Sequence, residues 1–445
     1  MGRLRAGAAQ VVITPPVGVW MAGFAARPSA SQGIHDDLMA KALVLDDGAQ
    51  RVALVTADLL GLDFDLLTRL KEHIQRQTGI APEGVLFNAS HTHGGPMTNT
   101  LRGMGERDEA YCDLLLRHIV GAVKMAVDRL QDARIGFGSA PCCIGFNRRE
   151  RIRRDVVLGL VKRGPTDTRV DVMRVDALDG QPLAVVFRHA THPVVLGADN
   201  VLITADWCGY AARTLPHFLI TQPPNHPATQ PVCLFVQGCC GDINPIQRGS
   251  FEAAAWLGRI VAAASAQAWY PIETREEVTL KTSLRILPLP LQDPPSVEEA
   301  EKQLEAYQQR AADAPKTQTN PGMVRTYQDL VGWAEKILEF AKEGIKPRTQ
   351  DFVVQTLTID DTAIVGLSGE PFIELAWDIE RRSPCARTWV LGYTNGCIGY
   401  VPTARAYEEG GYEVVDAVRY YGDLMIRPES AQRIGDAAVE MMRET

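Results

Sequence analysis

The sequence lacks several patterns that mark common classes of protein. No apolar run approaches the roughly 18 residues that a membrane-spanning helix needs, and neither a CxxC pair nor an HExxH motif occurs. The stretch GFAARPSASQGIH at residues 23–35 lacks the lysine of a phosphate-binding loop. The formal charge is -8, from 46 basic and 54 acidic residues, so nucleic acid is not an expected partner. The densest basic run, RRERIRR at Arg148–Arg154, is interpreted as a solvated turn or an anion anchor.

Two further absences bear on the cellular compartment. The first residues, MGRLRAGAAQVVITPP, lack the apolar segment of a secretion signal. We therefore expect a cytoplasmic protein, unless a targeting segment has been removed. The nine cysteines are odd in number and form no regular framework, which predicts buried free thiols in a reducing compartment.

The periodicity of the chain predicts an α/β protein with layered mixed β-sheets flanked by helices. Strand-like and helix-like runs alternate over the first 290 residues or so, and many of them end at Gly-containing turns. The clearest are a hairpin at Met39–Gly61, a helix at Asp63–Gly79, a strand at Gly84–Ser90, a helix at Asp108–Leu130, a hairpin at Arg169–Pro193 turning at Asp179-Gly180, and a strand in Pro231–Pro245.

One large catalytic domain is expected over residues 1–445. Its composition shifts at Ser296–Gly344, where prolines give way to two charged helical runs. We interpret this segment as a helical insertion that serves as a lid or an oligomer contact, which leaves a homo-oligomer open. Strands resume at Asp351–Phe372 with a hairpin through Asp360-Asp361.

The stretch NASHTHGGP at Asn88–Pro96 places two histidines after a buried-looking strand. Because side chains alternate along a strand, His91 and His93 are predicted to point the same way at its mouth. Two neighbouring imidazoles are better suited to binding a metal ion than to packing in a hydrophobic core. His73, His118, His217 and His226 lie on helices or loops without partners and are expected to be surface or packing residues.

Other predicted strands also end on residues of the kind that bind metals. One delivers His189 and His192, and another delivers Glu370. A third delivers Tyr393 or Tyr400. Two histidines and a carboxylate form a common catalytic zinc site with one position open for water. The spacing is dispersed, so satisfied structural histidines remain the alternative on these residues alone.

Several motifs, taken in order, resemble the neutral/alkaline ceramidase family. The resemblance spans roughly Ala6 to Glu413 and rests on GIHDDLMAKALVL, NASHTHGGP, GFNRR, VVFRHATHPVVL, GCCGDINP, LSGEPF and GYVPTARAYEEGGYE. It implies a zinc amidohydrolase that cleaves the N-acyl bond of ceramide, with a large α/β catalytic domain. In typical members an immunoglobulin-like C-terminal domain follows, and this sequence ends too early to include one.

The resemblance also implies roles for particular residues. The implied metal ligands are His91, His192, Glu370 and Tyr400, with His93 as a further ligand or as the partner that orients one. Arg148 resembles an anchor for a carbonyl or hydroxyl group, and Tyr407 and Tyr412 fall on two tyrosines of the same loop, one of which helps to hold substrate. The implied cofactor is one Zn²⁺ ion, although Mn²⁺ or Fe²⁺ would accept the same ligands.

The physical chemistry of these residue types agrees with hydrolysis. Zinc lowers the pKa of bound water towards about 7 and polarises a carbonyl. The fixed cation of Arg148 suits a developing oxyanion. Asp58 and Asp206 are candidates to orient ligand histidines through the second ring nitrogen, with helix capping as the alternative.

One motif departs from the family. The family carries serine where GDINP has Asn244, so covalent catalysis at this position is excluded; Asn244 is expected to donate to an oxyanion or to form a structural turn. The sequence also shows no evident face for approaching a bilayer. We therefore expect a small, N-acylated, soluble substrate. The alternatives are ceramide itself, a metal-dependent isomerase or lyase acting on a sugar-like polyol, and a catalytically inactive binding protein.

Overall fold

The computed structural model describes residues 2–219 and 230–444, so His226 lies outside the described part. None of the helices in this part is long and apolar enough to cross a lipid bilayer. All nine cysteines are free thiols; six are buried, as expected, and Cys143 is exposed.

The larger of the two main sheets has eight strands. They are β2 (Arg5–Val12), β4 (Met39–Asp46), β5 (Arg51–Ala57), β6 (Val85–Ala89), β7 (Gln131–Pro141), β10 (Arg169–Ala177), β11 (Pro182–His189) and β13 (Val232–Gln237). Their order is β13-β11-β10-β7-β2-β4-β5-β6, in which β5–β6 and β11–β13 pair in parallel and the other neighbours are antiparallel. Strands covered on both faces are almost continuously apolar, as the ALVL of β4 illustrates.

The second main sheet has four strands, in the order β16 (Leu280–Pro290), β17 (Thr349–Ile359), β18 (Thr362–Leu367) and β20 (Arg387–Leu391). Pro288 and Pro290 lie in β16, which is an edge strand, where a residue without an N–H group is tolerated. The two sheets face each other across a shared core that includes Leu43, Leu54 and Val186 from the first sheet, and Leu357, Ile364 and Trp389 from the second.

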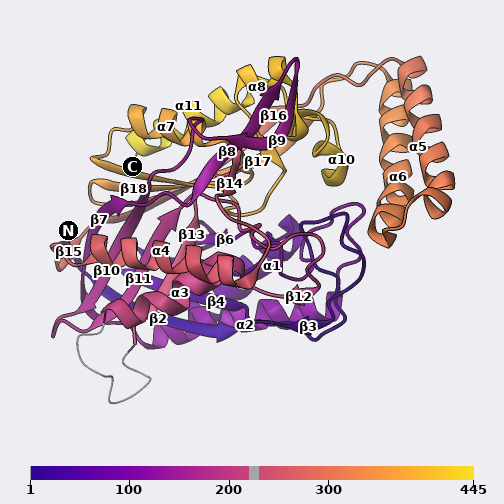
Figure 1. Ribbon diagram of the computed structural model, residues 1–445. Coiled ribbons are helices and arrows are strands. Elements are labelled where there is room, and N and C mark those ends of the chain that lie inside the picture. The colour runs from indigo at the N-terminus through magenta and orange to yellow at the C-terminus, as the bar shows by residue number, and fades with distance from the viewer. Residues whose placement is uncertain (1, 220–229, 445) are drawn as a thin grey trace.

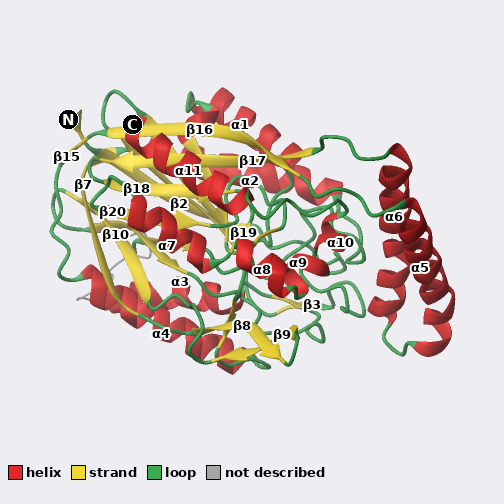
Figure 2. Ribbon diagram, turned by 90° about the horizontal axis from the view of Figure 1, so that it is seen from above, coloured by secondary structure: helices red, strands yellow, loops and turns green. Residues whose placement is uncertain are grey.

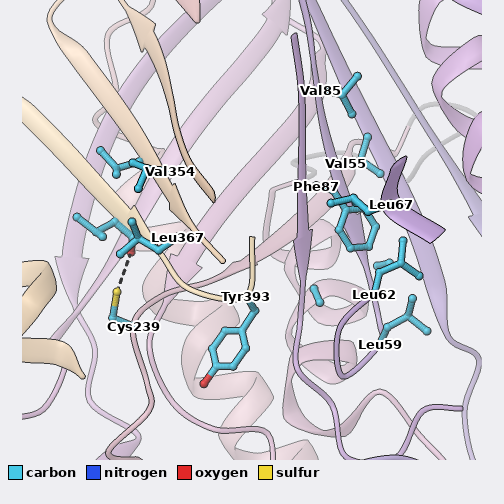
Figure 3. Packing of buried hydrophobic residues seen from close by; sticks show 14 of the residues in the cluster. Val55, Leu59, Leu62, Leu67, Val85, Phe87, Cys239, Val354, Leu367 and Tyr393 are labelled. Carbon is cyan, nitrogen blue, oxygen red and sulfur yellow. Dashed lines mark hydrogen bonds between the residues drawn. The ribbon is translucent and has the colours of Figure 1, made fainter. Parts of the chain in front are cut away.

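Helices cover the outer faces of the two sheets, and the result is a layered α/β fold (Figure 1). On the eight-stranded sheet lie α1 (Phe64–Thr78), α2 (Glu109–Asp128), α3 (Asp206–Leu219) and α4 (Phe251–Trp269), and on the four-stranded sheet lie α7 (Ile373–Arg382) and α11 (Ser430–Glu444). The predicted fold class is therefore confirmed. Figure 3 shows part of one buried cluster that joins helix α1 and both sheets, including Leu67, Val85, Phe87, Val354 and Leu367.

Several short elements complete the chain. They are β1 (Gly2–Arg3) with β15 (Glu277–Val278), β3 (Gly33–Ile34) with β12 (Leu202–Ile203), the three-stranded sheet of β14 (Ile243–Pro245), β8 (Gly145–Ile152) and β9 (Asp155–Val161), the pair β19 (Glu370–Pro371) and β21 (Tyr400–Val401), the 3-10 turn Pro82–Gly84, and α8 (Ala404–Glu409), α9 (Tyr412–Val415) and α10 (Val418–Tyr421).

A pair of helices stands at the side of the layered body, as Figures 1 and 2 both show. They are α5 (Val297–Thr317), which begins with a capping box at Ser296, and α6 (Pro321–Glu343). Their mutual contact is apolar, through Tyr307, Leu330, Trp333 and Ile337. The helical character predicted for this segment is confirmed, while its role as an insertion stays a prediction.

The turns marked by glycine or aspartate residues were predicted correctly. Gly79 ends α1 in the left-handed conformation at φ 74°, and hairpins turn after Asp46, at Asp179-Gly180 and at Asp360-Asp361. The turn predicted at Arg148–Arg154 was wrong for most of its length, because Arg148–Ile152 lies in β8, where β9 pairs with it. The alternative, an anion anchor, stays a prediction.

We predict that Trp389→Ala destabilises the protein by about 3–5 kcal/mol, because it empties a large volume between the sheets. Trp389 is 0% exposed, and its ring meets that of Phe137 edge-on at 5.9 Å. Trp377→Ala is the matched control, since Trp377 is 41% exposed on α7 and its loss should cost about 1 kcal/mol or less. Urea midpoints of the two variants measure the difference; equal shifts would contradict this account of the core.

Candidate metal centre

Three imidazoles meet at the end of the eight-stranded sheet. One ring nitrogen from each of His91, His93 and His192 lies within 4.8 Å of the other two. The Nε2 atoms of His91 and His93 are 3.4 Å apart, and the rings of His91 and His192 are nearly perpendicular, with centroids 5.0 Å apart. His91 and His192 are buried.

The carboxylate of Glu370 completes the cluster. Its Oε2 atom lies 3.3 Å from Nε2 of His91 and 3.3 Å from Nε2 of His192. Glu370 is itself buried and forms the start of the short strand β19. Segments separated by more than 270 residues along the chain therefore supply one compact set of nitrogen and oxygen donors.

The backbone brings His91 and His93 together by a different route from the one predicted. Strand β6 ends at Ala89, so strand alternation does not apply to the two histidines. His91 instead adopts a left-handed conformation at φ 66°, and its N–H donates to the carbonyl of Leu59 at 2.8 Å. The prediction that both rings share one site was right in outcome, but the predicted cause was wrong.

Backbone carbonyls fix the orientation of two of the rings. Nδ1 of His91 donates to the carbonyl of Leu60 at 2.8 Å, and Nδ1 of His192 donates to that of Cys240 at 2.6 Å. Because a carbonyl oxygen only accepts, each Nδ1 carries the proton and each Nε2 presents a lone pair to the cluster.

Asp58 and Asp206, the carboxylates expected in that orienting role, form other contacts. Asp58 accepts from the N–H of Met39, and Asp206 accepts from those of Leu196 and Trp207 at the start of α3. Asp206 therefore binds an N–H at a helix start, as the alternative interpretation held, whereas Asp58 binds the start of strand β4, which neither interpretation predicted.

An arginine and a tyrosine lie against the cluster. Glu370 and Tyr400 are register partners in the parallel pair of β19 and β21, which places the phenol beside the carboxylate. Arg148 donates from Nη2 to the Tyr400 hydroxyl at 2.9 Å and from Nε to Glu413 at 2.9 Å. The other carboxylate oxygen of Glu413 accepts from Arg149 at 2.6 Å, so one buried acid holds two neighbouring arginines.

Burial sets the protonation of the site. It lowers the pKa of His192 to about 4, with help from the positive charge of Arg148, and it lowers that of His93 well below the usual value. Burial raises the pKa of Glu370, but His91 and His192 outweigh it and the net direction is downward. Burial also raises the pKa of Tyr400 well above its ordinary range. At neutral pH His93 and His192 are therefore neutral, beside a carboxylate and a protonated phenol.

The structure does not bring every expected residue to the cluster. Tyr407 points elsewhere, because its hydroxyl donates to the carbonyl of Ile426 at 2.9 Å. Asn244 lies behind Arg148 and accepts from its Nη1 at 3.2 Å. Tyr412 does line the small cavity beside the histidines, with its ring 5.9 Å from the guanidinium of Arg148. His189 is buried apart from this group, against the carbonyl of Arg169.

Three residues that contact the predicted site were missed or left unassigned. The hydroxyl of Tyr421 donates to Oε1 of Glu370, and that of Tyr393 donates to Oε2 at 3.3 Å. The ring of Tyr393 also stacks on that of His91, with centroids 4.0 Å apart. Glu413 ends the motif GYVPTARAYEEGGYE, so its position was visible, but its partners were not. Tyr421 lies outside all of the motifs.

The donor set fits a divalent transition metal. Nε2 of His192, which faces the cluster, is buried without a hydrogen-bond partner, and such an orphaned nitrogen is costly unless something binds it. Two oriented Nε2 atoms beside an ionised carboxylate are typical of zinc sites. The described residues therefore contain a buried histidine group able to bind a metal.

Two cavities that share lining residues lie beside this group. A small cavity of about 30 Å³ touches His91, His93, Glu370, Tyr400 and Tyr412. A larger one of about 170 Å³ shares His91 and Tyr400 and is lined by both polar and apolar side chains, among them Asp63, Asn99, Leu101, Gln350, Ile398, Tyr421 and Met425.

Helix α6 braces the loops around these cavities at two places. Arg325 donates to the carbonyls of Arg27 and Gly103 at 3.0 and 3.1 Å. Further along, Lys336 donates to the carbonyl of Gly422 at 2.8 Å. Arg27 in turn donates to the carbonyl of His93 at 2.5 Å. One loop reaches His93 and the other carries Tyr421, so two loops that contact the site are attached to the same helix.

The amino-acid sequence was compared with known families. The family described as "Neutral/alkaline non-lysosomal ceramidase, N-terminal" matches residues 5–257, which is more than half of the chain. The chain belongs to this ceramidase family. The matched region contains His91, His93, Arg148 and His192, whereas Glu370 and Tyr400 lie beyond it.

Individual ceramidases are distant relatives. The neutral ceramidase of Drosophila melanogaster is 25% identical over 248 residues, and neutral ceramidase A of Dictyostelium discoideum is 24% identical over 253 residues. Each alignment covers 52% of this chain and 34% of the relative. The chain therefore spans about a third of the length of these relatives.

Solved structures of ceramidases share the fold. The neutral ceramidase from Pseudomonas aeruginosa matches with a TM-score of 0.71 at 19% identity, over 100% of this chain and 75% of that one. A ceramidase in complex with C2 matches with a TM-score of 0.74 at 18% identity, over 100% of this chain and 76% of that one. The similarity in fold thus extends past residue 257 to the segments that carry Glu370 and Tyr400.

We predict that His192→Ala loses bound metal, whereas Asn244→Ala keeps it. The first variant removes an oriented nitrogen from the cluster, and the second removes an acceptor of Arg148 that lies outside it. Elemental analysis after reloading with zinc and dialysis measures the ratio of metal to protein. A stoichiometric metal in the His192 variant would contradict the proposed ligand set.

We predict that Glu413→Gln destabilises the protein by about 3–5 kcal/mol, because it leaves the buried charge of Arg148 without its acid. Glu409→Gln is the control, since Glu409 is partly exposed and lies 3.5 Å from Arg149; its loss should cost about 1 kcal/mol or less. Urea unfolding of both variants checks the prediction, and a mild effect at Glu413 would show that Arg148 needs no buried partner.

Proposed function

We propose that this protein is a metal-dependent amidohydrolase that cleaves the N-acyl bond of a small substrate. The observation that carries the proposal is the buried meeting of His91, His93, His192 and Glu370 beside the pair formed by Arg148 and Tyr400. Membership of the ceramidase family supports an amide as the bond that reacts. A cytoplasmic location remains a prediction from the sequence.

Zinc is the metal we propose. His91, His192 and Glu370 would hold it, with His93 and Tyr400 at its side. Such an ion supplies a Lewis acid for a carbonyl and lowers the pKa of water. Mn²⁺ and Fe²⁺ accept the same donors, so the choice of zinc rests on the two imidazoles and one carboxylate.

The residues beside the metal group supply a proton and a fixed positive charge. Arg148 donates to the Tyr400 oxygen, so the proton on that oxygen is directed to another acceptor. The raised pKa of Tyr400 keeps the proton in place at neutral pH, ready to stabilise an oxygen on which negative charge develops. Glu413 holds Arg148 in position for this role.

The lining of the larger cavity favours an amphiphilic substrate. Asp63, Asn99 and Gln350 offer polar contacts, while Leu101 and Met425 offer apolar ones. A molecule with a hydroxylated or amino head and an acyl chain satisfies both kinds of surface. A short-chain N-acylsphingosine is therefore the first substrate to test, ahead of soluble N-acyl amino acids.

We predict that turnover in heavy-oxygen water places one labelled oxygen in the released carboxylic acid, because water becomes part of the acid during amide hydrolysis. Mass spectrometry of the products measures the label, and a chelator should abolish its appearance. His192→Ala should remove turnover, whereas His118→Ala, at an exposed histidine of α2, should retain it. Product formed without label would identify an isomerase or lyase instead and would overturn the proposal.

A further inference from the structure

The hairpin of β8 and β9 exposes an unusual number of aliphatic side chains. Ile152, Val157, Leu158 and Leu160 are 51%, 39%, 51% and 44% exposed within nine residues. Val415 on α9, which packs beside β9, is also exposed. The hairpin projects beside α8 and α9, as Figure 2 shows. A group of exposed aliphatic residues on one projection is typical of an interaction surface.

Cations surround these aliphatic residues. Arg151, Arg153, Arg154, Lys162 and Arg163 are all exposed, and within the described ranges none of their side chains has an ion pair or hydrogen bond. Asp155 is the one acid in residues 151–163. The chain as a whole carries a formal charge of -8, so this hairpin has the opposite sign to the rest of the molecule. Its complement is therefore an anionic surface.

The arrangement of the aliphatic residues distinguishes between partners. Val157 pairs with Glu150 and Leu158 pairs with Arg149, and successive side chains point to opposite faces of a hairpin. The aliphatic residues therefore lie on both faces along the hairpin, and its turn carries Arg153 and Arg154. A folded protein partner packs against one face, whereas the interface of a bilayer surrounds a hairpin that lies in it and places the cations at the headgroups.

The root of the hairpin belongs to the metal centre. Strand β8 carries both Arg148 and Ile152, which are four residues apart, or roughly 13 Å along an extended strand. Arg149 fixes the root to Glu413, and Gly411 fits closely against Val156. A hairpin held at a membrane would therefore keep the Arg148–Tyr400 pair near that surface.

We propose that the β8–β9 hairpin is a membrane anchor that inserts into the interface of an anionic lipid bilayer. The expectation from sequence that the chain has no bilayer-facing surface is thereby revised. The proposal stands apart from the proposed amidase activity, because binding to a bilayer requires neither bound metal nor turnover.

The test is flotation of the full chain with vesicles of phosphatidylcholine alone or mixed equally with phosphatidylglycerol. We expect binding to the anionic vesicles, and weaker binding at about 1 M salt, where the Debye length is about 3 Å. The triple variant Arg151→Gln, Arg153→Gln, Arg154→Gln should lower partitioning roughly 100-fold at low salt. The double variant Leu158→Ser, Leu160→Ser should lower it at least about tenfold.

Matched controls carry the same changes elsewhere on the surface. They are Lys316→Gln, Lys342→Gln, Arg443→Gln for charge and Ile286→Ser, Ile345→Ser for apolar exposure, and both should bind as the parent does. Thermal unfolding of each variant establishes that it is folded.

Four results of the binding experiments would overturn the proposal. They are absence of vesicle binding, equal binding to neutral vesicles, equal losses in the controls, and binding to polyglutamate without binding to vesicles, which would indicate an acidic protein partner. Conversion of a dimer to a monomer by the hairpin variants, seen by light scattering, would assign the surface to a second copy of the chain and would overturn it as well.

Discussion

The buried amide of Asn88 joins the ends of the two sheets, and the candidate metal centre depends on this junction. Its oxygen accepts from the N–H of Gln237 at 2.8 Å, and its nitrogen donates to the carbonyl of Gly392 at 2.8 Å and to the hydroxyl of Thr394 at 3.0 Å. These partners follow or end strands β13 and β20. Because no water reaches the amide to replace a lost bond, the segments hold a fixed separation.

That fixed separation keeps neutral and charged groups close together in a small volume. Neutral imidazoles, an ionised carboxylate and a protonated phenol lie together because burial disfavours every charge that lacks a partner. Arg148 keeps its charge because Glu413 lies beside it. The site thus has donor atoms for a cation on one side and the positive guanidinium of Arg148 on the other. Positive charge on both sides is the arrangement that would stabilise negative charge on a carbonyl oxygen.

The sequence predicted the parts of this site that are encoded locally. The strand before His91, the turn at Gly79 and the fold class follow from periodicity and turn residues. The left-handed conformation of His91, the carbonyl partners of the two Nδ1 atoms and the contact between Tyr421 and Glu370 depend on residues distant in the chain. Asp58 was a reasonable orienting partner for a histidine. It accepts a hydrogen bond from the N–H of Met39 instead, because buried backbone groups must also have hydrogen-bond partners.

The contacts of α6 have a consequence for the approach to the site. Arg325 and Lys336 attach the helix to loops beside the site, and they are eleven residues apart, or about 16 Å of helix. These loops also bond to each other, since the N–H of Arg102 donates to the carbonyl of Tyr420 at 2.9 Å. The insertion or removal of a single turn in α6 would therefore shift this junction while the donor atoms beneath stayed where the sheets hold them. The approach to the site can change in this way without any change to the chemistry below.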